Sequence, residues 1–119
     1  MFVAEINDDA WVNSSTLRFE ADKRMRQRLE TMGATCPFPR LWGLSLFGTS
    51  LRVYSCDVAT GELEPPFVDR PTPRRYLPSN FLDGAWNIDL LSHEGFTKMR
   101  EIVEDIEHMI ANAPVPETA

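Results

Sequence analysis

The first half of the chain shows two kinds of apolar pattern. Residues 2–6 form a short apolar run that predicts a strand, and the polar residues 8–15 then predict a turn and a helix N-cap. The next apolar residues recur at spacings of four, four, four and three, which predicts a helix ending at Gly33. These residues are Leu17, Ala21, Met25, Leu29 and Met32. We expect this stripe to face the core.

A β-hairpin is predicted in the middle of the chain. Residues 41–47 are an apolar run too short for a helix, and residues 48–50 form a turn into residues 51–56. The second strand alternates, so that Leu51, Val53 and Ser55 share one face and Arg52, Tyr54 and Cys56 share the other. Residues 62–64 predict a short edge strand, which ends at Pro65 because proline cannot donate to a strand ladder.

The second half begins with a proline-rich segment, residues 65–83, whose aromatic residues predict an ordered loop. Residues 86–90 predict a short strand, and Ser92 predicts the N-cap of a last helix. This helix has apolar residues at alternating spacings of three and four: Phe96, Met99, Val103, Ile106 and Ile110. We expect that seam to pack on the sheet, and a coiled-coil partner is the alternative that its short repeat disfavours.

These elements predict a single α+β domain over residues 1–111, followed by a flexible tail at 112–119. The fold is a mostly antiparallel sheet around a central hairpin, with two flanking helices. Because a helix separates the first strand from the hairpin, a parallel placement of that strand beside it fits the connection.

The composition predicts an intracellular protein, cytoplasmic or nuclear. The chain has 119 residues, of which 43% are apolar and 25% charged. No apolar run reaches the roughly 20 residues that a transmembrane helix needs, and the N-terminus does not resemble a signal peptide, so no membrane partner is expected. Cys36 and Cys56 have no CxxC spacing, and we expect both to be free thiols.

The net charge of −6 argues against a broad nucleic-acid surface, because phosphate binding depends on clustered basic residues. The distribution is uneven: residues 18–80 hold ten basic and seven acidic residues, whereas residues 81–119 hold two and eight. Four basic side chains lie off the apolar stripe of the first helix: Lys23, Arg24, Arg26 and Arg28. They predict a solvated face paired with Glu20 and Glu30, and nucleic-acid contact is the alternative.

The candidate chemistry is sparse. The chain has no GxSxG, GxxxxGK or GxGxxG motif, so hydrolase, kinase and dinucleotide chemistry lack support. Glu5, Asp8 and Asp9 lie around the end of the first strand, where carboxylates could bind magnesium, although three such acids also occur there by chance. We therefore expect no cofactor, with magnesium as the alternative.

Four segments resemble a known family: FVAEINDDAW at 2–11, CPFPRLWGLS at 36–45, GTSLRVY at 48–54 and WNIDLLS at 86–92. In them the chain is similar to uncharacterised fungal proteins with a PD-(D/E)XK nuclease-like domain, which sometimes occurs beside kinase-like modules. The resemblance implies a partial nuclease-like core, with Glu5 at the motif carboxylate and Asn7 at the motif lysine. A neutral amide replaces lysine poorly, and only residues 1–4 precede Glu5 to supply the other acid.

We therefore expect a non-enzymatic interaction or regulatory module on a degenerate nuclease-like scaffold. A metal-dependent nuclease or nuclease remnant, and a nucleic-acid-binding module without cleavage, are the alternatives. An unpaired edge at the first strand would favour a homodimer, or contact with another protein, through Phe2, Ile6 and Trp11. A monomer whose first strand is central and covered is the other possibility.

Overall fold

The computed structural model describes residues 2–68 and 77–112. Its strands are β1 (Phe2–Asn7), β2 (Arg40–Phe47), β3 (Ser50–Asp57), β4 (Leu63–Glu64) and β5 (Ile88–Asp89). Its helices are the 3-10 helix η1 (Asp9–Asn13) and the α-helices α1 (Ser15–Gly33) and α2 (His93–Ala111). Most of the predicted tail and residues 69–76 of the predicted loop lie outside the described residues.

The strands form one mixed sheet in the order β1-β2-β3-β4, with β5 also paired to β3. β2 and β3 are the predicted antiparallel hairpin, and β4 and β5 are the two predicted short strands. β1 runs parallel to β2, with Phe2 opposite Trp42 and Asn7 opposite Phe47. The parallel placement of the first strand is therefore confirmed, and β1 lies at an edge of the described sheet rather than at its centre.

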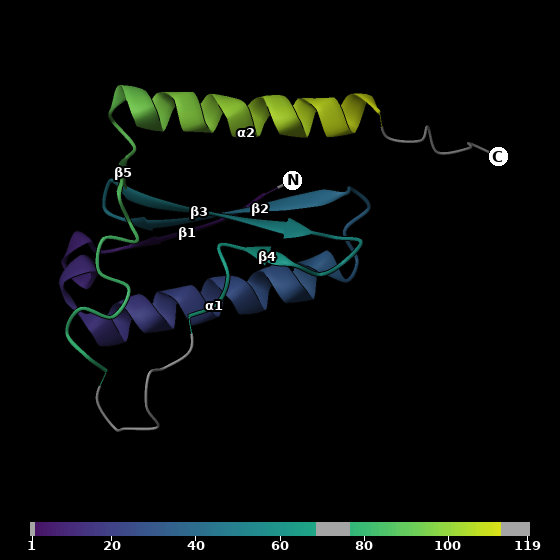
Figure 1. Cartoon of the computed structure of the whole chain (residues 1–119). Coiled ribbons are helices and arrows are strands. Elements are labelled where there is room, and N and C mark those ends of the chain that lie inside the picture. The colour runs from purple at the N-terminus through teal and green to yellow at the C-terminus, as the bar shows by residue number, and fades with distance from the viewer. Residues whose placement is uncertain (1, 69–76, 113–119) are drawn as a thin grey trace.

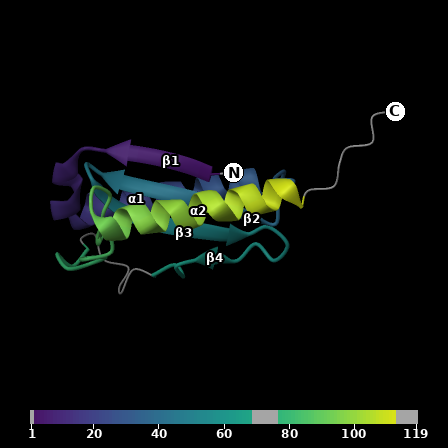
Figure 2. The same cartoon turned by 90° about the horizontal axis from the view of Figure 1, so that it is seen from above.

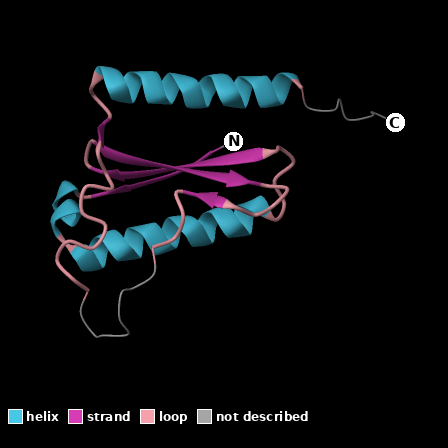
Figure 3. Cartoon of the chain, viewed as in Figure 1, coloured by secondary structure: helices cyan, strands magenta, loops and turns pink. Residues whose placement is uncertain are grey.

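The sheet lies between two helices. α1 covers one face and α2 covers the other, which gives three layers (Figures 1 and 3). Seen from above, β1 forms one margin of the sheet and β4 the other, with α2 crossing between them (Figure 2). The α+β class and the two flanking helices agree with the sequence prediction. No helix in the described part of the chain has the length and apolar content needed to cross a bilayer.

α1 begins after Ser14, whose side chain accepts a hydrogen bond from the Leu17 N–H. Ala21, Met25 and Leu29 of the predicted stripe are buried, whereas Met32 is exposed, so the prediction fails in the last turn. The helix approaches the sheet closely over Gly43, where a Cβ atom would lie 2.8 Å from the Met25 sulfur. A side chain at this point would displace Met25, so the close packing of α1 on β2 depends on the glycine.

α2 begins after the predicted cap Ser92, but its buried face differs from the prediction. Phe96, Val103 and Ile110 of the predicted seam are exposed, and Met99 and Ile106 are only partly buried. The buried positions are instead Gly95, Ile102 and Met109. Gly95 sets this rotation, because it packs directly on the Asp89 carbonyl and a Cβ atom there would lie 2.8 Å from the Leu90 Cα.

The segment after residue 76 returns along the α1 side of the sheet, where Trp86 stacks on Phe47 with ring centroids 4.2 Å apart. Arg18, buried in α1, holds this segment in place. Its guanidinium donates to the carbonyl oxygens of Phe81 at 2.9 Å and Ser79 at 2.8 Å. For the described residues from 77 onward, the prediction of an ordered loop is confirmed.

Candidate functional site

The residues predicted for nuclease chemistry, Glu5 and Asn7, lie on β1 on the side that faces α1. Glu5 Oε1 accepts a hydrogen bond from Arg24 Nη1 at 2.7 Å, so an arginine already neutralises the carboxylate. Glu5 Oε2 and Asn7 Nδ2 are buried and have no hydrogen-bond partner within the described residues. This pair has the polarity of a binding site, one acceptor and one donor, but it lacks a second carboxylate.

Asp8 and Asp9 do not complete a metal site with Glu5. Asp8 Oδ1 caps η1 by accepting from the Ala10 N–H at 2.8 Å. Asp9 is the first residue of η1, and its Cβ lies against Gly48 of the β2–β3 turn. Among residues 2–68 and 77–112, no group of three or more His, Cys, Asp or Glu side chains could hold a metal ion.

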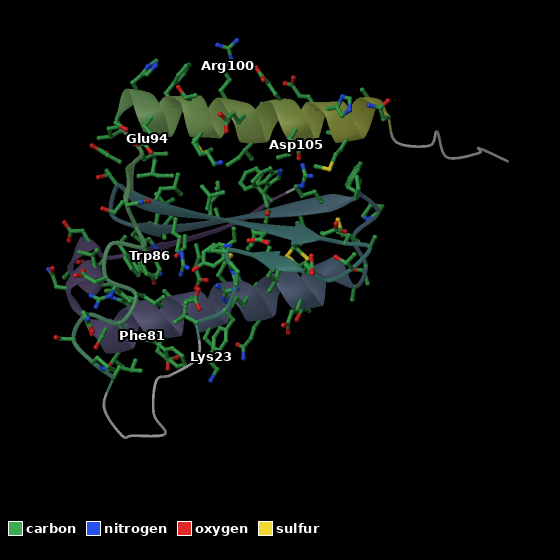
Figure 4. All side chains as sticks on the ribbon, viewed as in Figure 1. Lys23, Phe81, Trp86, Glu94, Arg100 and Asp105 are labelled. Atoms are coloured by element: carbon green, nitrogen blue, oxygen red, sulfur yellow. The ribbon has the colours of Figure 1, made fainter. Side chains whose placement is uncertain are left out.

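The four basic residues predicted for one surface of α1 are divided. Lys23, Arg24 and Arg28 are exposed, and Lys23 points away from the sheet (Figure 4), whereas Arg26 is buried. Arg24 pairs with Glu5 across to β1 rather than with an acid of its own helix. The prediction that all four lie on a solvated face is therefore wrong for Arg26.

Arg26 belongs to a buried charge cluster centred on Asp22, which sequence reasoning missed. Asp22 Oδ2 accepts from Arg26 Nε at 3.0 Å, and Asp22 Oδ1 accepts from Arg52 Nη1 and the Tyr54 hydroxyl, both at 2.8 Å. The Arg52 guanidinium lies 5.3 Å from the ring centroid of Trp86, whose Nε1 donates to Ser45 Oγ at 3.1 Å. The cluster joins α1, the hairpin and the returning segment.

The cluster around Asp22 stabilises the fold and is poorly suited to proton transfer. Burial raises the pKa of the Tyr54 phenol, Arg52 opposes this rise, and the charge and hydrogen bond of Asp22 add to it. A phenol that holds its proton this firmly is a poor general base. Burial likewise raises the pKa of the Cys56 thiol, which with Cys36 is one of two free cysteines, as predicted. A thiol in this state is a weak nucleophile.

A cavity of about 540 Å³ lies beside β3, between β4 and β5. Arg52, Glu64, Asn87 and Lys98 are its main polar lining residues. Arg52 is committed to Asp22, and Lys98 lies 3.6 Å from Glu101. The cavity therefore gathers no pair of groups suited to acid–base or nucleophilic catalysis.

The clearest unsatisfied surface is the outer edge of β1, which has no partner strand among the described residues. Val3 is buried with residues of α1, so strand alternation places Phe2 and Ile6 on the opposite face of β1, toward α2. They are 53% and 72% exposed, and Phe2 also lines a cavity between β1 and α1. The third predicted interface residue, Trp11, is half-buried, packs on Phe47 at a centroid distance of 6.3 Å, and lies under the Arg24 guanidinium. The structure thus separates Trp11 from the two β1 residues.

The apolar flank of α2, Phe96, Val103 and Ile110, extends this surface. Lys98 lines the cavity beside β3 and β4, so it lies on the flank of α2 that faces β4, away from β1. Val103 follows Lys98 by five residues, which turns it about 140° around the helix axis, toward the side on which Figure 2 shows β1. Phe96 and Ile110 lie seven residues from Val103 and share that flank, and all three are exposed.

The fold and this surface define the class of protein: a small α+β domain with a mixed sheet between two helices and one unpaired sheet edge. Comparison with protein-family models, with curated proteins and with solved structures finds no match to this chain.

Proposed function

We propose that this chain is a non-enzymatic interaction module, on a degenerate nuclease-like scaffold, that associates with a second copy of itself. The observation that carries the proposal is the unpaired edge of β1 with exposed Phe2 and Ile6 on it. Unpaired strand edges favour pairing with another chain, and exposed apolar side chains beside the edge add hydrophobic stabilisation.

The state of the predicted catalytic residues supports the absence of turnover. In a nuclease of this kind the motif carboxylate binds metal, and the motif lysine stabilises charge on the phosphate. Here Glu5 is paired with Arg24, and Asn7 offers a neutral amide. A scaffold whose carboxylate is already paired with an arginine, and whose lysine position holds a neutral amide, fits a binding role better than a catalytic one.

A metal-dependent nuclease remnant is the second candidate, and one observation favours it. Glu5 Oε2 is buried without a hydrogen-bond partner in the described part of the chain, and a buried carboxylate oxygen normally has a partner. Heat released on titration with magnesium, and abolished by Glu5→Ala, would support this candidate. For the other alternative, nucleic-acid binding without cleavage, the candidate surface is formed by the exposed basic residues Lys23, Arg24 and Arg28.

Size-exclusion chromatography with light scattering tests the proposal. At concentrations that bracket a micromolar dissociation constant, we expect the wild-type protein to reach twice the mass of one chain. Ile6→Lys places a charge on the edge and should return the protein to the mass of one chain. The matched control is Leu91→Lys, which makes the same change at an apolar side chain that is 79% exposed but lies near the start of α2.

Leu91→Lys should remain a dimer. A wild-type protein that keeps the mass of one chain throughout the range would overturn the proposal. An equal loss of association in both variants would show that the contact does not depend on β1.

A further inference from the structure

We infer that two copies of this chain pair through antiparallel β1 strands, with a two-fold axis at Ala4, into one continuous sheet. This inference rests on the proposed self-association and specifies its geometry. A symmetric pair of this kind uses the same surface on both copies, so each residue contact occurs twice.

The backbone of β1 fixes which residues are free to pair. The Asn7 carbonyl accepts from the Gly48 N–H at 2.9 Å, so the backbone groups of Asn7 point toward β2. These directions alternate along a strand, which leaves the N–H and C=O groups of Phe2, Ala4 and Ile6 pointing outward from the sheet. An incoming strand must therefore pair with these three residues.

The side chains then select the register. With the axis at Ala4, Phe2 of each copy lies opposite Ile6 of the other, and Ala4 lies opposite Ala4. Each of these pairs of residues exchanges two backbone hydrogen bonds, which makes about six in all. An axis at Val3 places Phe2 opposite Ala4 and leaves Ile6 opposite no described residue. An axis at Glu5 places two carboxylates directly opposite each other, which is destabilising.

The other face of β1 supplies charge complementarity. In this register Glu5 of the second copy lies opposite Val3, which lines a cavity of about 430 Å³ between β1 and α1. Two arginines also line that cavity, Arg24, which already bonds to Glu5 of its own chain, and Arg28, and no acidic residue does. The second copy thus brings Glu5, whose Oε2 is buried without a partner among the described residues, to a basic groove.

The face toward α2 supplies apolar contact. The Phe2–Ile6 pairs lie on the α2 side of the joined sheet, and the apolar flank of α2 from each copy faces them. Five exposed apolar residues per chain, Phe2, Ile6, Phe96, Val103 and Ile110, would then lie along a single trough across the axis. Their burial would provide the hydrophobic part of the interface.

A charge-exchange experiment tests the register. In Phe2→Glu/Ile6→Lys, each new glutamate would lie opposite a lysine of the second copy, whereas Phe2→Lys/Ile6→Lys would place lysines opposite each other. The two positions are too far apart within one extended strand to pair with each other. We expect the dimer of the glutamate–lysine variant to be at least tenfold tighter than that of the lysine–lysine variant, by sedimentation or light scattering.

The outcomes separate the two proposals. A monomeric wild-type protein contradicts self-association itself, whereas a wild-type dimer with equal affinities for the two double variants contradicts only the register.

A measurement on the unmodified protein covers the case in which the variants do not fold. In a mixed sample of isotope-labelled and unlabelled chains, we expect an intermolecular nuclear Overhauser effect between the α protons of Val3 and Glu5, whose Cα atoms would be about 4.5 Å apart. A wild-type dimer without this contact overturns the inference.

Discussion

The two faces of the sheet are joined to their helices by different interactions. On the α1 face, the apolar cluster includes Tyr54, whose hydroxyl donates to a buried carboxylate, Asp22, that also bonds to Arg26 and Arg52. On the α2 face, the buried cluster is entirely apolar: Leu44, Leu46, Leu51 and Ile102. Among the described residues, the charged contact between α2 and the sheet is made by Asp105, which faces the sheet (Figure 4) and bonds to Arg40 and Trp42.

This difference separates two tasks. Directional bonds to Asp22 specify one position for α1, because any shift would leave charges buried without partners. α2 is held by apolar area, by the close backbone approach at Gly95 and by the two bonds of Asp105, so it can leave an apolar flank exposed without losing its position. The face that is fixed by charge is the more rigidly specified one, and the face that is fixed by area carries the apolar part of the surface proposed for association.

Asp22→Ala should have the largest effect on this comparison. The change leaves the Arg26 and Arg52 guanidiniums without their shared carboxylate in a buried site, which typically costs about 3–5 kcal/mol. We expect the free energy of unfolding, measured in urea, to fall by that amount.

Glu104→Ala is the matched control, because it removes an exposed helical pair with Arg100 at 3.0 Å. Exposed pairs of this type contribute about 0.3–0.5 kcal/mol. If Asp22→Ala costs no more than Glu104→Ala, the buried cluster does not hold α1 to the sheet.

Gly95→Ala should have the next largest effect, with a sign that depends on the structure. Helix propensity alone predicts stabilisation by about 1 kcal/mol. The new methyl group, however, would collide with the backbone of Asp89 and Leu90, and displacement of a packed helix typically costs about 1–3 kcal/mol or more. We expect net destabilisation and a loss of α2 packing, measured by urea unfolding and by hydrogen exchange in α2.

Gly33→Ala is the control within α1, because a Cβ atom there meets only the Cys56 sulfur at an ordinary 3.5 Å. It should be neutral or stabilising. A stabilised Gly95→Ala variant would show that this close approach does not set the rotation of α2.

The same glycine explains why sequence reasoning succeeded for one helix and failed for the other. In α1 the apolar residues Ala21, Met25 and Leu29 are buried, so their spacing identified the face that contacts the sheet, except in the last turn. In α2 the buried row lies one position before the predicted row of Phe96, Val103 and Ile110. The buried row begins with Gly95, which has no apolar side chain that would reveal it in the sequence. The backbone contact with β5 that selects this row is not visible in the sequence.

Polar interactions could be predicted from the sequence only where the partners are close together along the chain. The caps Ser14 and Ser92 and the two faces of β3 follow from short-range pattern. The partner of Arg26, Asp22, lies at the helical spacing of four, but burial of both depends on Arg52 from a strand 30 residues away. The sequence predicts the unpaired edge of β1. It does not predict that the exposed residues of α2 enlarge this surface, because the predicted seam places Phe96, Val103 and Ile110 in the core.

Alkaline pH gives the smallest expected effect, and it concerns the α1 face alone. A tyrosine in the unfolded chain ionises with a pKa of about 10, and burial raises the pKa of folded Tyr54 well above that value. The folded protein therefore holds this proton more tightly than the unfolded chain, so the contribution is complete below pH 10 and is lost as pH rises toward the folded pKa. At pH 11 the loss is about 1.4 kcal/mol.

Tyr54→Phe isolates this term. The variant also loses the hydrogen bond to Asp22, so its stability at pH 9 should already be lower than that of the wild-type protein. The decrease in unfolding free energy between pH 9 and pH 11 should nevertheless be about 1.4 kcal/mol smaller in the variant, because the only buried phenol described has been removed. Parallel pH profiles for the two proteins would mean that Tyr54 ionises normally, and that the α1 face admits water where the structure places a sealed cluster.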